Sequence, residues 1–163
     1  MRAWGIALGA LGALRRDDAL SRQALEKLRR ATELRPDYAQ AFSSWGRELA
    51  VLAAKKTSVE HWAQAIEKLQ RAADLAPGDV RTLTVLGTAL AGLGDLKRNA
   101  SLYGQAVEKF RLATEIAPDF LDALEAWGMV LIGWSQLSPS PELEKEIERV
   151  FALRFGASRK QRE

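Results

Sequence analysis

The chain has 163 residues, 47% of them hydrophobic and 28% charged, a composition typical of a globular protein with an apolar core. It has no cysteine, which excludes disulfide frameworks, thiolate chemistry and zinc–sulfur sites. The 24 basic residues are nearly balanced by 21 acidic ones, so a net charge of +3 predicts a mixed surface and argues against nucleic acid as the partner.

The first apolar run, residues 3–14, follows an early arginine and so resembles a secretory signal. However, Trp4 and Gly5 recur as Trp45 and Gly46, at the same spacing as the repeats described next, so this run is in register with the rest of the chain. We therefore expect an uncleaved structural helix. No apolar run reaches the roughly 18–20 residues that a membrane span requires, and we expect a cytoplasmic protein without one.

One sequence pattern occurs three times, and a constant spacing of about 41 residues separates its copies, a period typical of stacked repeat units. It reads ALEKLRRATELRP at 24–36, AIEKLQRAADLAP at 65–77 and AVEKFRLATEIAP at 106–118. The same spacing relates four glycines: Gly5, Gly46, Gly87 and Gly128. The sequence therefore predicts an array of similar units along the whole chain.

Each unit is predicted to contain two helices. The apolar positions favour first helices over residues 3–14, 39–54, 80–93 and 121–136. The second helices should begin after residues that cap helix starts well, namely Asp17, Ser58, Asn99 and Ser140. Prolines should end the first three of them, namely Pro36, Pro77 and Pro118. Carboxylates that follow these prolines are candidate caps for the next first helices, namely Asp37, Asp79 and Asp119.

The predicted fold class is therefore all-α, an α-solenoid of four antiparallel helix pairs. We expect a single repeat domain over residues 1–155, with units at about 1–38, 39–79, 80–120 and 121–161. The last helix should span residues 141–155, and the polar tail 156–163 should lack regular structure.

The recurrent glycine predicts a close approach of two helices. A glycine inside a helix costs about 1 kcal/mol relative to alanine, so its return in every unit needs a packing reason. The small residues Ala24, Ala65 and Ala106 should face these glycines. Three tryptophans also share one repeat position and are expected to pack in the core or at the joints, namely Trp4, Trp45 and Trp127.

These residues resemble the tetratricopeptide-repeat family over essentially the whole chain. The second unit matches at Phe42, Trp45, Gly46, Leu49, Ala65, Leu69, Ala72 and Pro77. The resemblance implies a right-handed superhelix with a concave groove that binds peptides. The unit here has about 41 residues, whereas the family standard has about 34. The difference of about seven residues is almost two helical turns, so we expect longer helices rather than longer loops.

No enzymatic constellation is complete in this sequence. His61 is the only histidine, and at the start of a second helix it is expected to pack, with a proton switch as the alternative. The glycines at 87 and 92 lack the Lys-Ser/Thr that a phosphate loop needs. We therefore expect no catalytic residue, no metal site and no cofactor.

The resemblance places groove candidates on the first helices. They are Ser43 and Arg47 in the second unit, Arg81, Thr84 and Thr88 in the third, and Asp122, Glu125, Met129 and Ile132 in the fourth. One part of this set is polar and mildly basic, and the other is acidic and apolar. The expected function is a non-enzymatic scaffold that binds a peptide or helix of a partner protein in this groove.

Two alternative functions remain open. Ile6, Ala7 and Ala10 give the first helix an apolar outer face, which would suit a structural module that self-associates through its N-terminal end. The second alternative is a binder of amphipathic presequence helices, similar to an import receptor, which would depend on Asp122 and Glu125.

Overall fold

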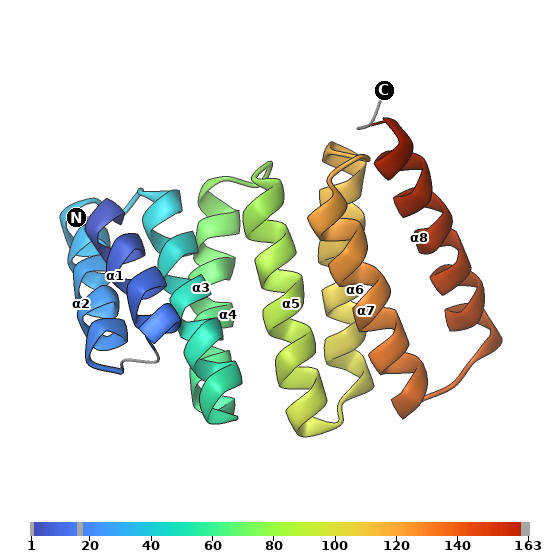
Figure 1. The fold of residues 1–163 in the computed structure, drawn as a ribbon, viewed down its shortest axis with the longest axis horizontal. Helices are drawn as coiled ribbons and strands as arrows, with labels where there is room; N and C mark the ends of the chain where they lie inside the picture. Colours follow the sequence, from blue (N-terminus) through green and yellow to red (C-terminus); the bar gives the residue numbers. More distant parts are fainter. Residues whose placement is uncertain (1, 16–17, 161–163) are drawn as a thin grey trace. The chain divides into compact units, whose positions relative to one another are not determined.

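The computed structural model describes residues 2–15 and 18–160 (Figure 1). This part of the chain contains eight α-helices and no strand. The helices are α1 (Arg2–Arg15), α2 (Asp18–Leu34), α3 (Ala39–Lys56), α4 (Val59–Leu75), α5 (Val80–Lys97), α6 (Ala100–Ile116), α7 (Leu121–Leu137) and α8 (Pro141–Lys160). They form two compact units, Met1–Pro77 with α1 to α4 and Gly78–Glu163 with α5 to α8.

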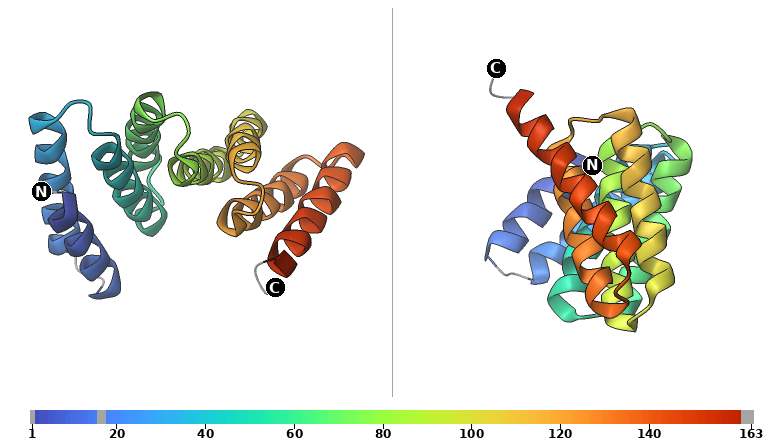
Figure 2. Two further views of the ribbon diagram at one scale, coloured as in Figure 1. Left: turned by 90° about the horizontal axis from the view of Figure 1, so that it is seen from above. Right: turned by 90° about the vertical axis from the view of Figure 1, so that its right-hand side faces the viewer.

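Both units are built in the same way. In the first, α2 packs against α1 and α3, α1 also contacts α3, and α4 packs against α3. In the second, α6 packs against α5 and α7, α5 also contacts α7, and α8 lies alongside α7 (Figure 2). Fully buried side chains such as Leu28, Leu69 and Phe110 lie between the two helices of a pair. The core is therefore a row of helix–helix contacts.

The helices are long and the turns inside a pair are short, as the sequence predicts. α3 and α5 have 18 residues each, and α4 and α6 have 17. A turn of two residues joins the helices of each of these pairs, and its first residue takes a left-handed conformation, with φ 50° at Thr57 and 49° at Arg98. The prediction of long helices joined by short turns is therefore confirmed for these two pairs.

The caps predicted for the second helices are confirmed wherever the structure describes them. The side chains of Ser58 and Asn99 accept hydrogen bonds from the backbone N–H groups of His61 and Ser101. Ser140 accepts one from the N–H of Leu143 at 3.2 Å. Asp17 lies outside the described residues.

The caps predicted for the first helices are correct only at Asp79, which accepts from the N–H of Arg81. Asp37 and Asp119 were predicted wrongly, because Tyr38 and Phe120 occupy the capping position and make no side-chain cap bond. The reason is register. Asp79 stands two residues after its proline, whereas the other two carboxylates stand one residue after theirs and so miss the position by one residue.

The last helix is longer than the sequence suggested. Residues 156–160, expected to begin an irregular tail, continue α8 as far as Lys160. No proline follows Phe155 to stop the helix, and Ala157 is buried, so tertiary contact offsets the cost of about 1 kcal/mol for the glycine at 156. Residues 161–163 lie outside the described part.

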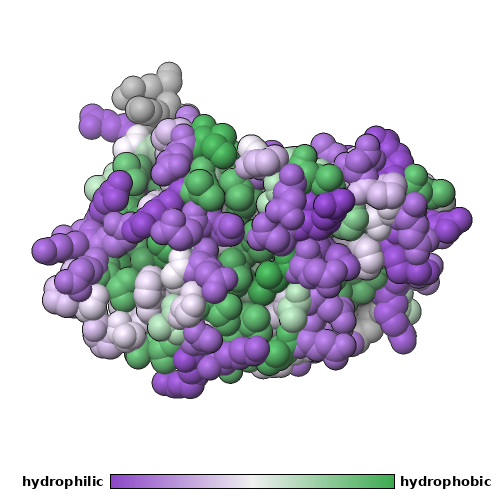
Figure 3. All heavy atoms as spheres, turned by 180° about the vertical axis from the view of Figure 1, so that it is seen from behind, coloured by the Kyte–Doolittle hydropathy of each residue, from purple (hydrophilic) through white to green (hydrophobic). Residues whose placement is uncertain are grey.

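The surface mixes polar and apolar side chains. On the face drawn in Figure 3, hydrophilic and hydrophobic residues are interspersed. None of the helices in the described ranges combines the length and the hydropathy that crossing a bilayer requires.

Candidate functional site

In three of the four helix pairs, the recurrent glycine brings two helices into close contact. A Cβ atom built on Gly46 would lie 2.5 Å from Leu69 Cγ and 2.9 Å from the backbone oxygen of Ala65. On Gly87 it would lie 2.8 Å from Phe110 Cζ and 3.1 Å from the backbone oxygen of Ala106. Gly5 makes the same kind of contact with α2. The predicted close approach is confirmed at these three glycines.

The fourth pair is open at the same position. A Cβ atom on Gly128 would meet its nearest neighbours, Val150 and Phe151, only at 3.9 and 4.0 Å. The facing position, held by alanine in the other pairs, is Ile147 here. A side chain larger than alanine at this register position accompanies the wider separation of the two helices. Phe151 consequently stays 38% exposed, whereas the equivalent Phe110 is fully buried.

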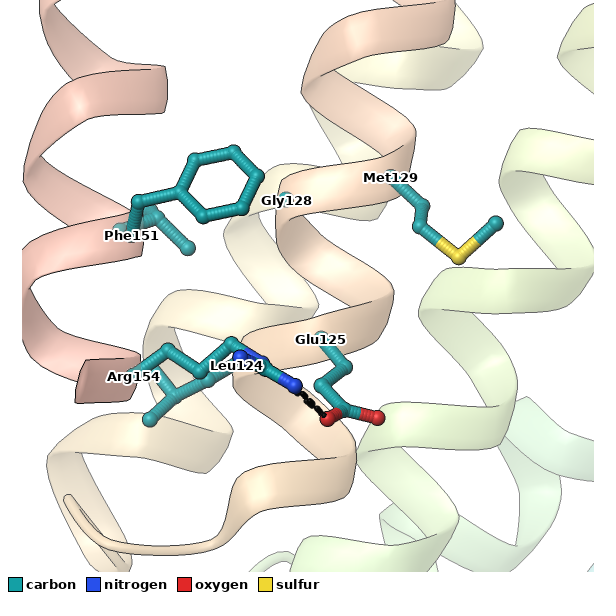
Figure 4. Close-up of a pocket in the computed structure, with 7 residues that line it drawn as sticks. Leu124, Glu125, Gly128, Met129, Phe151 and Arg154 are labelled. Atoms are coloured by element: carbon teal, nitrogen blue, oxygen red, sulfur yellow. Dashed lines mark hydrogen bonds and ion pairs between the residues drawn. The ribbon is translucent and has the colours of Figure 1, made fainter. Parts of the chain in front are cut away.

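This opening forms a cavity of about 350 Å³ between α7 and α8. It is lined by Leu124, Glu125, Gly128, Met129, Val150, Phe151 and Arg154. Figure 4 shows Phe151 extending from α8 towards Gly128 of α7, with Met129 on the far edge of α7. Five of the seven lining residues are apolar, so the cavity suits an apolar group.

An ion pair bounds one end of this cavity. Arg154 Nη2 lies 2.5 Å from Glu125 Oε1, and its Nε donates to the same oxygen at 3.1 Å (Figure 4). Both side chains are exposed, so the pair contributes only about 0–1 kcal/mol to stability. Arg154 stands where the first three pairs have alanine, so its long side chain can reach across the mouth of the cavity.

The four groove candidates of α7 lie on one exposed stripe. Asp122, Glu125, Met129 and Ile132 follow at i, i+3, i+7 and i+10, and all four are exposed. Met129 is 74% exposed, which is unusual for so large an apolar side chain. The stripe is acidic where α7 begins and apolar beyond its first turns.

The candidates on α5 differ from one another. Arg81 and Thr88 are exposed, but Thr84 is buried and its hydroxyl donates to the backbone oxygen of Val80 at 2.8 Å. The hydroxyl of Thr84 is therefore bonded within its own helix, and so is that of Thr88, which donates to the backbone oxygen of Thr84 at 3.0 Å. In the first unit, α3 carries Ser43, which is half-buried, and Arg47, which is exposed.

The N-terminal candidates lie on α1. Ile6 is half-buried and Ala7 is exposed, while the side chain of Ala10 lies outside the described part. The packing expected of Trp4 is wrong, because this side chain is 71% exposed and no described helix covers it. Trp127 is buried as predicted, and Trp45 is half-buried with Lys68 Nζ 4.8 Å from its ring centroid.

Glu48 and Tyr103 are titratable residues that are buried without having been predicted to be so. Glu48 of α3 packs against Gly9 of α1, where an added Cβ would overlap its carboxylate. Burial raises the pKa of Glu48, and the positive charge of Arg47 opposes this shift. In the second unit, Tyr103 donates a hydrogen bond to Asp95, and burial together with this bond raises its pKa to about 12.

Two observations concern the residue types that catalytic and metal sites use most often. His61 is half-buried, with Nδ1 2.7 Å from the capping hydroxyl of Ser58, which fits the packing role that the sequence predicts. Within residues 2–15 and 18–160, no three carboxylate or imidazole side chains gather into a set that could hold a metal ion. The indole N–H of Trp127 is buried and makes no hydrogen bond to the described residues, which costs about 1–3 kcal/mol and fits the loose packing around α8.

Comparison with known proteins supports a class of fold. No family model matches the chain, and no curated protein matches it either. Forty solved chains do match. Together with the eight helices of the described residues, these matches confirm the predicted all-α solenoid, whose fold is that of a TPR-like helical repeat.

One of these solved structures is titled "Crystal structure of MamA protein". Its TM-score is 0.63, its sequence identity is 22%, and the likeness covers 94% of this chain and 73% of that one. An identity this low shows a common fold alone.

The sequence reasoning found the stripe on α7 but missed the cavity beside it. Phe151, Gly128 and Arg154 were not among the candidates. The signal was present in the repeat register, because Ile147 and Arg154 replace alanines at the two small positions of the second helix. These two larger residues occur only in the fourth helix pair, the pair in which α7 and α8 lie further apart.

Proposed function

We propose that this protein is a non-enzymatic interaction scaffold that binds a segment of a partner protein on the second unit. The binding surface is the exposed stripe of α7, with the cavity between α7 and α8 as an apolar anchor site. We further propose that the units are a long variant of the tetratricopeptide repeat, with a period of about 41 residues.

The observation that carries this proposal is the contrast between the fourth pair and the third. In the third pair Phe110 closes the joint completely, whereas in the fourth Phe151 and Met129 remain in contact with solvent beside an apolar cavity. Exposed large apolar side chains around a concave site mark binding surfaces in soluble proteins. A helix or an extended segment with one apolar anchor would cover them.

The remaining groove candidates extend this proposal. Arg81 and Thr88 on α5 would contact the same segment within the second unit. On the first unit, taken by itself, Ser43 and Arg47 of α3 would contact a partner segment. The two arginines would pair with carboxylates of a partner outside the part of its segment that lies at α7 and α8.

Site-specific photo-crosslinking tests the proposal. A benzophenone amino acid would replace Met129, and a matched control would carry it at Leu112, an exposed apolar residue of α6. We expect position 129 to yield a discrete crosslinked partner that position 112 does not yield. Identical products at both positions would show that the α7 stripe is not a specific binding surface.

A second candidate function is self-association through the N-terminal end. The observation in its favour is Trp4, 71% exposed on α1 beside the exposed Ala7. Sedimentation over a wide concentration range would show a rising mass, which Trp4→Ser should abolish. A mass that stays that of one chain at high concentration would exclude this function.

A further inference from the structure

We propose that the cleft between α7 and α8 selects a basic amphipathic helix of a partner protein, whose one large apolar side chain enters the 350 Å³ cavity. This inference rests on the proposed function and adds the chemical class of the partner. It follows from the charge of the rim, from the size of the cavity and from the shape of the cleft.

The exposed edge of α8 carries a second stripe that borders the cavity. Glu144, Glu148, Phe151 and Phe155 follow at i, i+4, i+7 and i+11, so they share one side of the helix, and all four are exposed. Phe155 is 68% exposed. Like the stripe of α7, this one combines carboxylates with large apolar side chains.

The rim of the cleft is acidic in a chain that is basic overall. The two stripes bring four carboxylates, Asp122, Glu125, Glu144 and Glu148, and no cation of their own. The cation that borders the cavity is Arg154, which is already paired with Glu125. The chain as a whole carries a net charge of +3. Such a local reversal of sign favours a cationic partner and disfavours an anionic one.

The size of the cavity limits what can enter it. Pockets for small ligands measure about 300–1,000 Å³, so 350 Å³ lies at the lower end of that range. A cavity of this size has room for one large apolar side chain of a partner. Asp122 and Glu125 lie where α7 begins, and Glu144 and Glu148 lie where the antiparallel α8 begins, so carboxylates occupy both ends of the cleft. Met129 and Phe151 lie between them, and Phe155 follows Arg154 at the end that holds Glu125. A segment that fits is apolar at its centre and basic on both sides.

A helix is the form of partner that this cleft fits. A groove between two helices receives an amphipathic helix, whose anchors recur at i, i+3, i+4 and i+7. The helix would lay its apolar face along Met129, Ile132 and Phe151, and its flanking lysines or arginines would reach the carboxylates of the rim. A helix bonds its own backbone N–H and C=O groups, so it can cover this apolar surface with side chains alone.

The test measures binding of designed peptides to the full chain by fluorescence anisotropy. The probe is an amphipathic peptide of about 16 residues with a leucine and phenylalanine stripe and a lysine face, long enough to be helical when bound. Its counterpart has glutamate in place of every lysine, and a scrambled peptide has the same composition without the stripe. We expect only the basic amphipathic peptide to bind, and less tightly as salt concentration rises.

Two variants of the protein locate the site. Gly128→Leu should fill the cavity, since a Cβ there meets no atom closer than 3.9 Å, and should weaken binding by more than about tenfold. Glu144→Lys with Glu148→Lys should weaken it roughly tenfold. The matched control, Glu60→Lys with Glu67→Lys, makes the same change of net charge on exposed positions of α4 and should leave binding unchanged.

Circular dichroism checks whether each variant folds. If Gly128→Leu does not fold, the two glutamate-to-lysine pairs still test the site. Preferential binding of the acidic peptide, abolished by Gly128→Leu, would overturn the chemical class proposed here and leave the proposed function standing. If no peptide binds and crosslinking at position 129 is also negative, both fail. If instead the chain self-associates and Gly128→Leu lowers its sedimentation mass, a second copy occupies the cleft and the inference is overturned.

Discussion

Replacing each recurrent glycine by alanine should change the free energy of unfolding in opposite directions in the closed helix pairs and in the open one. Alanine is favoured over glycine inside a helix by about 1 kcal/mol. At Gly128 nothing opposes this gain, because the nearest atom lies 3.9 Å from the new Cβ. We therefore expect Gly128→Ala to raise the free energy of unfolding by about 0.5–1 kcal/mol.

Gly87→Ala is the matched variant, because it lies in the same unit. Its Cβ would come within 2.8 Å of the ring of Phe110, which is fully buried, and within 3.1 Å of a backbone oxygen, so neither neighbour can swing away. Overpacking of this kind costs about 1–3 kcal/mol and outweighs the helical gain. Gly46→Ala, with contacts at 2.5 and 2.9 Å, should be more destabilising still.

Urea unfolding followed by far-ultraviolet circular dichroism measures these differences. Gly128→Ala and Gly87→Ala should differ by about 1–3 kcal/mol, since the helical gain is common to both and only the overpacking differs. If Gly128→Ala destabilised the protein as much as Gly87→Ala does, the fourth pair would be as closed as the third. That result would remove the cavity on which the binding site depends.

Other consequences of the structure can be tested singly. Asp79→Ala should lower the free energy of unfolding by about 1 kcal/mol through loss of a cap, whereas Asp37→Ala, which removes no cap bond, should change it by less than about 0.5 kcal/mol. The buried Glu48 has a raised pKa, so the folded state holds its proton more tightly than the unfolded state does, and stability should fall as pH rises from about 4.3 through the folded pKa. Urea midpoints measured across this pH range should fall less in Glu48→Gln than in the unmodified protein. If the pH dependence of the midpoint is the same in both, Glu48 ionises as freely in the folded state as in the unfolded chain. Absorbance at the tyrosinate band should show a transition with a pKa of about 12 that is missing in Tyr103→Phe. If the transition that Tyr103→Phe removes lay near the ordinary tyrosine value of about 10 instead, this hydroxyl would not be buried.

The sequence predicted the helices well because their signals are local and repeated. Apolar periodicity, capping side chains at Ser58 and Asn99, and the prolines that end the second helices all act within a few residues. The caps at Asp37 and Asp119 were predicted wrongly because an offset of one residue decides which residue occupies the capping position. The sequence alone does not show this offset, because it does not give the first residue of the helix.

The candidate site was half predictable. The stripe of α7 follows from helical spacing, so Met129 and Ile132 could be placed on one face from sequence alone. The cavity depends on the separation of two helices, which is a tertiary property and not a local pattern of the sequence. The exposure of Trp4 was missed because it shares its repeat position with the buried Trp127. The helices that surround the two positions differ, and a repeat register does not show this.

The loose contact between α7 and α8 also affects how the second unit opens. Detaching α8 exposes less new apolar surface than detaching α6, because Phe151 is already partly solvated and Phe110 is not. Local opening therefore has a lower free energy at α8, and its backbone amides should exchange with deuterium before those of α6. A helix bound in the cleft would slow the same amides, so hydrogen exchange along α8 would report directly how much of the protein is occupied.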